Sequence, residues 1–248
     1  MKKTSKKGIL FILLLVLFLP IACLNSNKDE INVNSPALNF KEDTSQQQAT
    51  GFPILMPIDE ISQNTNLQQT VKRIKYALKT KNVDSLLYYV ADDVKISFSK
   101  NKNEPDFKTF WKLSNNSNAS DIWELLENLL KLGGVFYNDK KFFIPYTFTY
   151  FPAEYNPNEF GVIISDNILM KEKPKTSSST IGELTYEIVR IIPEKRNEKD
   201  KKNWVKIKRQ NESVGYIRQA FIRRPIDYRL GFRKKNGEWK IDFLMNGR

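Results

Sequence analysis

Apolar residues near the start of the folded part of the chain recur three or four positions apart, with basic residues between them: Leu67, Val71, Ile74 and Leu78. This spacing predicts an amphipathic helix. Asp84 is predicted to cap a second, short helix. The strongest helical pattern is predicted to begin at a Ser120 cap and run to Leu132, before the stop signal Gly133-Gly134.

Alternating and aromatic-rich segments predict strands around these helices, at residues 94–98, 135–137, 142–144 and 146–151. Pro105 is predicted to open one more helical stretch, which carries Phe107, Phe110 and Trp111. Helices followed by strands indicate an α+β domain over residues 67–158.

The C-terminal part, residues 226–248, reads as a β-hairpin. Two alternating runs flank Asn236-Gly237, a dipeptide typical of two-residue hairpin turns. A lone hairpin is only marginally stable. We therefore expect it to pack back on the α+β domain, which would make the segment before it an insertion.

Residues 1–22 predict an export signal. A lysine-rich start precedes an uninterrupted apolar run over residues 9–19, too short to cross a bilayer core of about 30 Å. The segment resembles a bacterial lipoprotein signal, with Ala22 just before Cys23. The resemblance implies that Cys23 carries lipid, including an acyl chain such as palmitate, and anchors the protein to a membrane. Residues 23–66, rich in Asn, Gln and Ser, are then expected to be a flexible linker.

The amino-acid composition excludes several kinds of catalytic and metal-binding site. The chain has no histidine and one cysteine, which excludes Ser-His-Asp and Cys-His catalysis, histidine-bearing zinc sites and intrachain disulfides. Carboxylate-only catalysis stays open, and Asp92-Asp93, expected at a helix-to-strand turn, is the neighbouring carboxylate pair to consider. We expect no cofactor. The formal net charge is +12, and residues 160–248 hold 21 basic and 11 acidic residues. Such an excess of positive charge bears on the binding partners of the protein and not on its fold.

The element order of residues 67–158 faintly resembles NTF2-like domains, in which helices pack on a curved sheet and often enclose an apolar pocket. Trp111 and Trp123 are candidates to line such a pocket. Large aromatic residues at helical spacing are more often core residues, and that is the favoured interpretation.

Residues 159–225 resemble bacterial SH3 domains. The resemblance rests on Ile168 to Pro174, Ile181-Gly182-Glu183-Leu184, Asn203-Trp204-Val205-Lys206-Ile207, and Val214-Gly215-Tyr216-Ile217 before Phe221-Ile222. It implies a small all-β barrel, in which Gly215 allows close backbone packing.

The expected ligand-binding residues lie in this region. Trp204 and Tyr216 are interpreted first as core residues, while Tyr186, Tyr216 or Phe221 can alternatively open onto a groove, since SH3-type barrels bind through aromatic surfaces. Four arginines gather near the end of the barrel and could hold carboxylates: Arg218, Arg223, Arg224 and Arg229.

Two functions follow from these observations. The first is a non-enzymatic, lipid-anchored envelope protein, expected at the outer membrane of a Gram-negative bacterium, whose SH3-like barrel binds peptidoglycan or an envelope protein. Lys28-Asp29-Glu30 resembles signals that place some lipoproteins on the cell surface, although solvated linker charges explain it equally well. The alternative is a small-ligand carrier or carboxylate enzyme using an NTF2-like pocket. Export argues against nucleic acid as a partner despite the basic charge.

Overall fold

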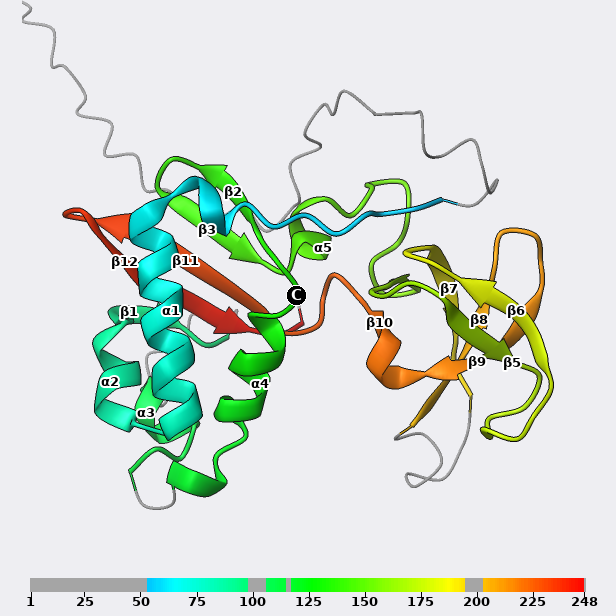
Figure 1. Ribbon diagram of the computed structural model, residues 1–248, viewed down its shortest axis with the longest axis horizontal. Helices are drawn as coiled ribbons and strands as arrows, with labels where there is room; N and C mark the ends of the chain where they lie inside the picture. The colour runs from blue at the N-terminus through cyan, green and yellow to red at the C-terminus, as the bar shows by residue number, and fades with distance from the viewer. Residues whose placement is uncertain (1–52, 98–105, 115–116, 195–202, 248) are drawn as a thin grey trace, which may run out of the picture. The chain divides into compact units, whose positions relative to one another are not determined.

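The computed structural model describes residues 53–97, 106–114, 117–194 and 203–247. They all belong to one of the two compact units into which the chain divides, residues 34–248. Helices and strands both contribute to it, with one five-stranded and one seven-stranded sheet (Figure 1). The predicted α+β class is therefore confirmed.

The five-stranded sheet joins segments from both ends of the described chain in the order β1-β12-β11-β3-β2. Its strands are β1 (Val90–Lys95), β2 (Val135–Asn138), β3 (Lys141–Ile144), β11 (Arg229–Lys235) and β12 (Glu238–Met245). Strand β12 runs parallel to β1, and the other pairs are antiparallel. The C-terminal strands thus complete a sheet that residues 90–144 begin.

The predicted hairpin is confirmed. Strands β11 and β12 pair from Lys235↔Glu238 onward, and Asn236 and Gly237 both have positive φ, at 53° and 84°, as a type I′ turn requires. β11 pairs with β3 and β12 with β1, so the hairpin lies between the other strands of the sheet. A marginal element is stabilised here by neighbours on both sides.

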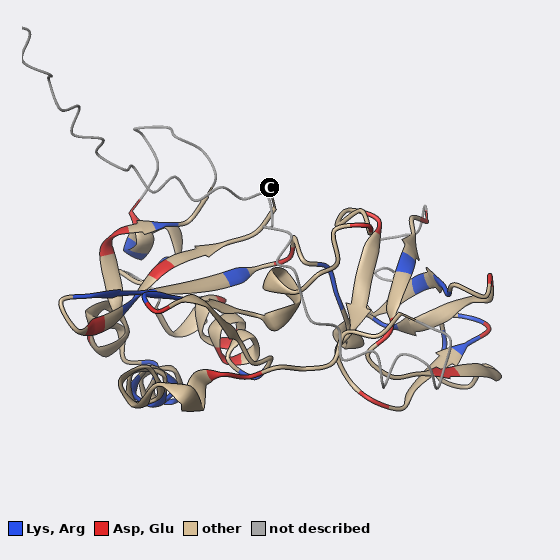
Figure 2. Cartoon of the chain, turned by 90° about the horizontal axis from the view of Figure 1, so that it is seen from above, with Lys and Arg blue, Asp and Glu red and all other residues tan. Residues whose placement is uncertain are grey.

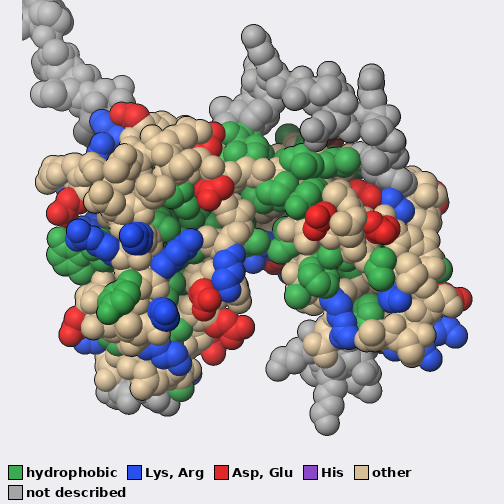
Figure 3. Space-filling view, in the orientation of Figure 1, with side chains coloured by type: hydrophobic (Ala, Val, Ile, Leu, Met, Phe, Trp, Pro, Cys, Tyr) green, Lys and Arg blue, Asp and Glu red, His purple; other side chains and the backbone are tan. Residues whose placement is uncertain are grey.

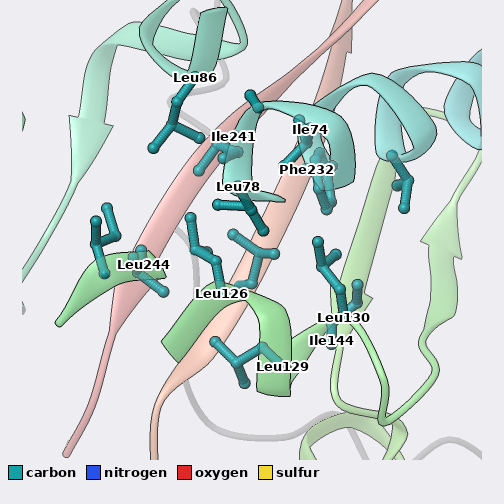
Figure 4. Packing of buried hydrophobic residues seen from close by; sticks show 14 of the residues in the cluster. Ile74, Leu78, Leu86, Leu126, Leu129, Leu130, Ile144, Phe232, Ile241 and Leu244 are labelled. Atoms are coloured by element: carbon teal, nitrogen blue, oxygen red, sulfur yellow. The ribbon is translucent and has the colours of Figure 1, made fainter. Parts of the chain in front are cut away.

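Helices cover one face of this sheet: α1 (Thr65–Thr80), α2 (Val83–Tyr88) and α4 (Ile122–Leu129). Their apolar stripes meet sheet residues that include Phe232 and Ile241 in one core, seen closely in Figure 4. Trp239 is only 1% exposed in that core. The helical periodicity of the sequence identified most of these buried positions.

Two predicted helix starts are placed differently. The side chain of Asn82, not Asp84, accepts from the Ser85 backbone N–H, so Asp84 lies in the first turn, where an acid still favours the helix dipole. The N-cap residue of α4 is Asp121 rather than Ser120, although Ser120 Oγ accepts from the Ile122 backbone N–H at 3.3 Å. The helix ends at Leu129, three residues earlier than predicted.

The remaining short helices differ from the sequence pattern too. α3 spans Phe107–Phe110 and is capped by Asp106, whereas Pro105 and Phe98 lie outside the described residues. The strand predicted at residues 146–151 is wrong, because α5 spans Tyr146–Thr149. A helical turn lets Phe148 pack against Phe143 and Phe243 on the sheet face opposite α1. Two 3₁₀ turns complete this part: η1 (Ile61–Gln63) and η2 (Ser117–Ala119).

The seven-stranded sheet has the order β10-β4-β7-β8-β9-β5-β6. Its strands are β4 (Phe160–Ile163), β5 (Ile168–Lys171), β6 (Thr180–Leu184), β7 (Ile188–Ile192), β8 (Trp204–Lys208), β9 (Val214–Arg218) and β10 (Ile222–Arg223), with η3 (Gln219–Phe221) before the last. Within the described residues, the edge strands β6 and β10 do not pair with each other, so the sheet is not a closed barrel.

The inner side chains of these strands form a second core, which includes Met170, Ile207 and Ile217. Gly215 lies where a Cβ would stand 2.6 Å from Met170 Cγ and 2.9 Å from the Lys171 carbonyl oxygen. The close approach expected at Gly215 is therefore confirmed.

The end of the predicted linker, residues 53–66, is ordered, and the prediction was wrong there. Ile188 donates its backbone N–H to Pro53 O, and Leu55 donates to Tyr186 O, both at 2.8 Å. Further along, Glu60 N donates to Gly134 O, and Glu60 Oε2 accepts from Phe136 N. Residues 53–61 show neither helical nor strand periodicity, yet the backbone of this segment is bonded to two parts of the fold.

Of the helices in the described ranges, none is long and apolar enough to cross a bilayer.

Candidate functional site

The outer face of strands β8 and β9 carries polar and aromatic side chains in register. Along β8, Val205 and Ile207 pack toward the core, so Trp204 and Lys206 point to the opposite face. In the neighbouring strand, Trp204 is paired with Arg218 and Lys206 with Tyr216. Strand alternation and antiparallel pairing therefore place these four side chains together.

Arg218 stacks on Trp204. Its guanidinium carbon lies 4.3 Å from the centroid of the Trp204 ring, and its Nη2 donates to Thr176 Oγ1 at 2.7 Å. A guanidinium that stacks by its flat face still presents N–H donors along its edge. The contact fixes the orientation of a cation at a partly exposed aromatic surface.

Tyr216 belongs to a second set of polar contacts on the same face. Its hydroxyl donates to Glu194 Oε1 at 2.8 Å, and the same carboxylate oxygen pairs with Lys206 Nζ at 3.0 Å. Lys206 also lies 5.8 Å from the centroid of the Tyr216 ring. Glu194 thus holds an aromatic and a basic side chain in place together.

A shallow hollow of about 210 Å³ adjoins these residues, and Glu194, Trp204 and Lys206 line it. Arg224 and Asp227 line it as well, and they pair with each other, since Arg224 N donates to Asp227 Oδ2 at 2.8 Å. We call the outer face with Trp204, Lys206, Tyr216 and Arg218, together with this hollow, the β8–β9 face.

Two predicted ligand residues are structural instead. Arg223 donates through Nη2 to Tyr228 O, and burial lowers the pKa of Arg223, an effect that Asp227 partly offsets. Arg229 is 3% exposed, donates to Gly247 O and lies over the Phe148 ring at 4.7 Å. Burial lowers its pKa to about 10. Of the four arginines expected near the end of the barrel, Arg218 and Arg224 therefore lie at the β8–β9 face, whereas Arg223 and Arg229 are bonded to backbone carbonyls.

The predicted aromatic residues also separate. Tyr216 lies on the β8–β9 face. Phe221 is 38% exposed in η3, between Gln219 and Ile222, which line the hollow. Tyr186 lies away from them, in a left-handed conformation with φ of 52°, and its carbonyl accepts from Leu55 N. Tyr186 therefore joins the N-terminal segment to the sheet.

The favoured interpretation of Trp204 and Tyr216 as core residues is wrong, because both are partly exposed and neither belongs to the core of the seven-stranded sheet. Lys206 and Glu194 were missed altogether. The alternation of Trp204 and Lys206 with the apolar Val205 and Ile207 was the signal that could have identified an outer face.

Trp111 and Trp123 are core residues, as favoured, at 8% and 4% exposure among the residues under the helices. Asp92 and Asp93 lie in strand β1 rather than in a turn, and Asp93 pairs with Arg233. Across the described ranges, no three acidic or sulfur side chains gather to hold a metal ion. Cys23 and Lys28-Asp29-Glu30 lie outside those ranges.

Comparison of the chain with protein-family models, with curated proteins and with solved structures found no match in any of the three.

Proposed function

We propose that this chain is a non-enzymatic, lipid-anchored protein of the bacterial cell envelope whose SH3-like region binds peptidoglycan or an envelope protein. The observation that carries the proposal is the β8–β9 face. There, Arg218 stacks on Trp204, and Glu194 holds Tyr216 and Lys206 beside them. Aromatic faces and fixed cations occur together there on one partly exposed surface.

Peptidoglycan fits the chemistry of this face. Its stem peptides carry carboxylates, which a guanidinium edge can hold through two parallel hydrogen bonds. Its sugars and peptide backbone offer flat surfaces to aromatic rings. The stacking on Trp204 orients Arg218 before any ligand arrives, which reduces the entropy lost on binding.

Strand order supports an SH3-like architecture for residues 159–225. The segments matched to the bacterial SH3 pattern are strands β5 to β10, and β7, β8 and β9 follow one another as antiparallel neighbours. Their inner residues share one small core. We propose an SH3-like fold on these grounds.

The NTF2-like resemblance of residues 67–158 is also a proposal, supported by helices that cover one face of a mixed sheet. Trp111 and Trp123 fill the space between them instead of lining a pocket. Because these two side chains fill the interior of residues 67–158, binding through the seven-stranded sheet is favoured over a ligand carried inside that domain.

The proposed anchor is lipid on Cys23, which precedes the folded part by about thirty residues. An extended chain of that length reaches on the order of 100 Å at about 3.3 Å per residue. The folded part can therefore meet a wall layer or a neighbouring protein while it stays at the membrane.

Retention of the purified chain on peptidoglycan sacculi tests the proposal. We expect the chain to sediment with sacculi and to be released as salt rises, because exposed charges are screened over about 8 Å at physiological ionic strength. Recovery of all the protein in the supernatant at low salt would exclude peptidoglycan as the ligand.

A further inference from the structure

Helix α1 presents a basic face to solvent. Four cations lie on it, and no acidic residue occurs between Thr65 and Thr80: Lys72, Arg73, Lys75 and Lys79. Tyr76 lies among them and is 68% exposed. In the space-filling view, Lys and Arg side chains gather over this part of the surface, with hydrophobic side chains beside them (Figure 3).

The end of α2 adds two further tyrosines. Tyr88 is 57% exposed, and its ring meets that of Tyr89 edge-on, with centroids 5.0 Å apart. Lys240, from strand β12, lies with Nζ 3.9 Å from the centroid of Tyr88 and donates to the Tyr88 carbonyl oxygen. A hydrogen bond with Tyr89 raises the pKa of Arg73. Cations and rings from three elements therefore interleave. Figure 2 marks the basic positions along the hairpin and the helix.

These residues line a continuous open groove. A hollow of about 940 Å³ lies between α1 and α2, and a smaller one of about 180 Å³ extends toward the start of β12. The two share four lining residues: Gln69, Arg73, Tyr88 and Tyr89. We call the whole the tyrosine groove. Two adjoining open hollows suit an extended ligand rather than a compact one.

We propose that the tyrosine groove binds an acidic polysaccharide, a linear glycan that carries carboxylate or sulfate groups. The face of an aromatic ring is electron-rich, so the C–H face of a sugar ring packs favourably on it. Arg73, Lys72 and Lys240 supply the positive charge that repeated anionic groups require. The amide of Gln69 and the amide of Asn66 offer donors and acceptors for sugar hydroxyls.

The lining side chains of the groove carry a net charge of one positive unit, which favours an anionic ligand. Three of the side chains that line the groove are cations, and two are acids. The acids are Asp84, in the first turn of α2, and Glu238, which pairs with Lys240 at 3.6 Å. An acidic peptide carries the same negative charge as an acidic polysaccharide, but its binding does not require several exposed aromatic rings. This site is separate from the β8–β9 face, so the inference does not rest on the proposed function.

The test uses the full chain in detergent, on immobilised heparin, with hyaluronate, dextran and polyglutamate as competitors. We expect Tyr76→Ala and Lys72→Gln each to weaken heparin binding by roughly tenfold, because the first removes an exposed ring from the groove and the second removes a cation. Lys75→Gln makes the same charge change on the same helix but does not line the groove, so it should change binding less than twofold.

Competition separates the ligand classes. Hyaluronate should displace the chain from immobilised heparin, dextran should not, and polyglutamate should do so only weakly. Arg218→Gln should keep heparin binding even if it abolishes binding to sacculi. Equal losses for Lys72→Gln and Lys75→Gln would show that only net charge matters and overturn the proposal. Full competition by polyglutamate would also overturn it, in favour of an acidic peptide.

Discussion

The ring of Phe243 lies directly against Gly231 in the neighbouring strand. A Cβ on residue 231 would stand 2.0 Å from Phe243 Cε1, a distance that no real pair of carbon atoms adopts without a bond. The two residues are partners in the β11–β12 register. Phe243 also meets Phe143, with ring centroids 5.4 Å apart, and Phe148 at 6.5 Å. The missing side chain at position 231 makes room for this aromatic cluster.

Gly231→Ala should therefore destabilise the fold. The added methyl group must displace the Phe243 ring or the backbone of β11, and overpacking of this kind costs about 1–3 kcal/mol. Urea unfolding followed by circular dichroism measures the loss. The control is Gly182→Ala, whose Cβ would meet side-chain atoms at a longer distance, Arg209 Nη1 and Met170 Cε, each at 3.3 Å, so that shifts of a few tenths of an ångström accommodate it. If both variants unfold at the wild-type midpoint, the Phe243 placement is wrong.

Glu187 and Arg209 form a nearly buried ion pair under the N-terminal segment. Arg209 donates Nε to Oε2 at 2.9 Å and Nη2 to Oε1 at 2.7 Å, with the side chains 11% and 6% exposed. Glu187→Gln leaves the cation without its counter-charge and should cost about 3 kcal/mol. Surface Glu127→Gln, which breaks the exposed pair with Lys131, is the control and should cost less than about 0.5 kcal/mol. Equal effects would mean that the buried pair is solvated.

The exposed pair Glu159–Arg190 predicts a small acid dependence of stability. Hydrogen bonding and charge from Arg190 lower the pKa of Glu159 below its ordinary 4.5. A lowered carboxyl pKa stabilises the fold above the ordinary value, and this contribution is lost as the pH falls through the folded pKa. Arg190→Gln should remove that part of the pH dependence: its midpoint should lie slightly below that of the wild type at neutral pH, and the two should converge as the pH falls below 4.5. Thermal melts between pH 3 and 7, at low and high salt, measure it. An unchanged acid limb would contradict the pairing.

Cys23→Ser should leave the protein exported but release it from membranes. Several acyl chains on one residue hold far better than a single chain, so their loss removes the anchor. Fractionation of cells into membrane and soluble extracts measures the distribution. A variant that stays in the membrane fraction would show that another part of the chain holds it there.

Periodicity predicted the parts of the fold that local physics controls. Leu67, Val71 and Ile74 lie buried at the spacing that identified α1, and Asn236-Gly237 makes the turn that its two positive φ angles require. Periodicity does not predict which strands pair when they lie far apart in the sequence. The contact of Ile54 with Glu187 and the parallel pairing of β1 with β12 leave no local pattern in the sequence.

The site was only half predictable for a related reason. Arg218 and Arg223 look alike in sequence, five residues apart and both near apolar neighbours. The structure stacks Arg218 on Trp204 and turns Arg223 toward the Tyr228 carbonyl, because β9 ends at Arg218 and η3 redirects the chain before β10. Changing Arg223 would therefore perturb folding, so it is unsuitable as a test of binding.

The central claim is that the β8–β9 face binds the cell wall, and one comparison tests it most directly. The affinity of the purified full chain for peptidoglycan sacculi is measured by co-sedimentation for the wild type, Arg218→Gln and Arg190→Gln. Both substitutions remove one positive charge from the same sheet, but Arg190 pairs with Glu159 and lies over Phe160, away from Trp204. We predict that Arg218→Gln weakens binding roughly tenfold, the value of one charge-assisted contact, while Arg190→Gln stays within about twofold of the wild type. Equal affinities for all three proteins would contradict the claim.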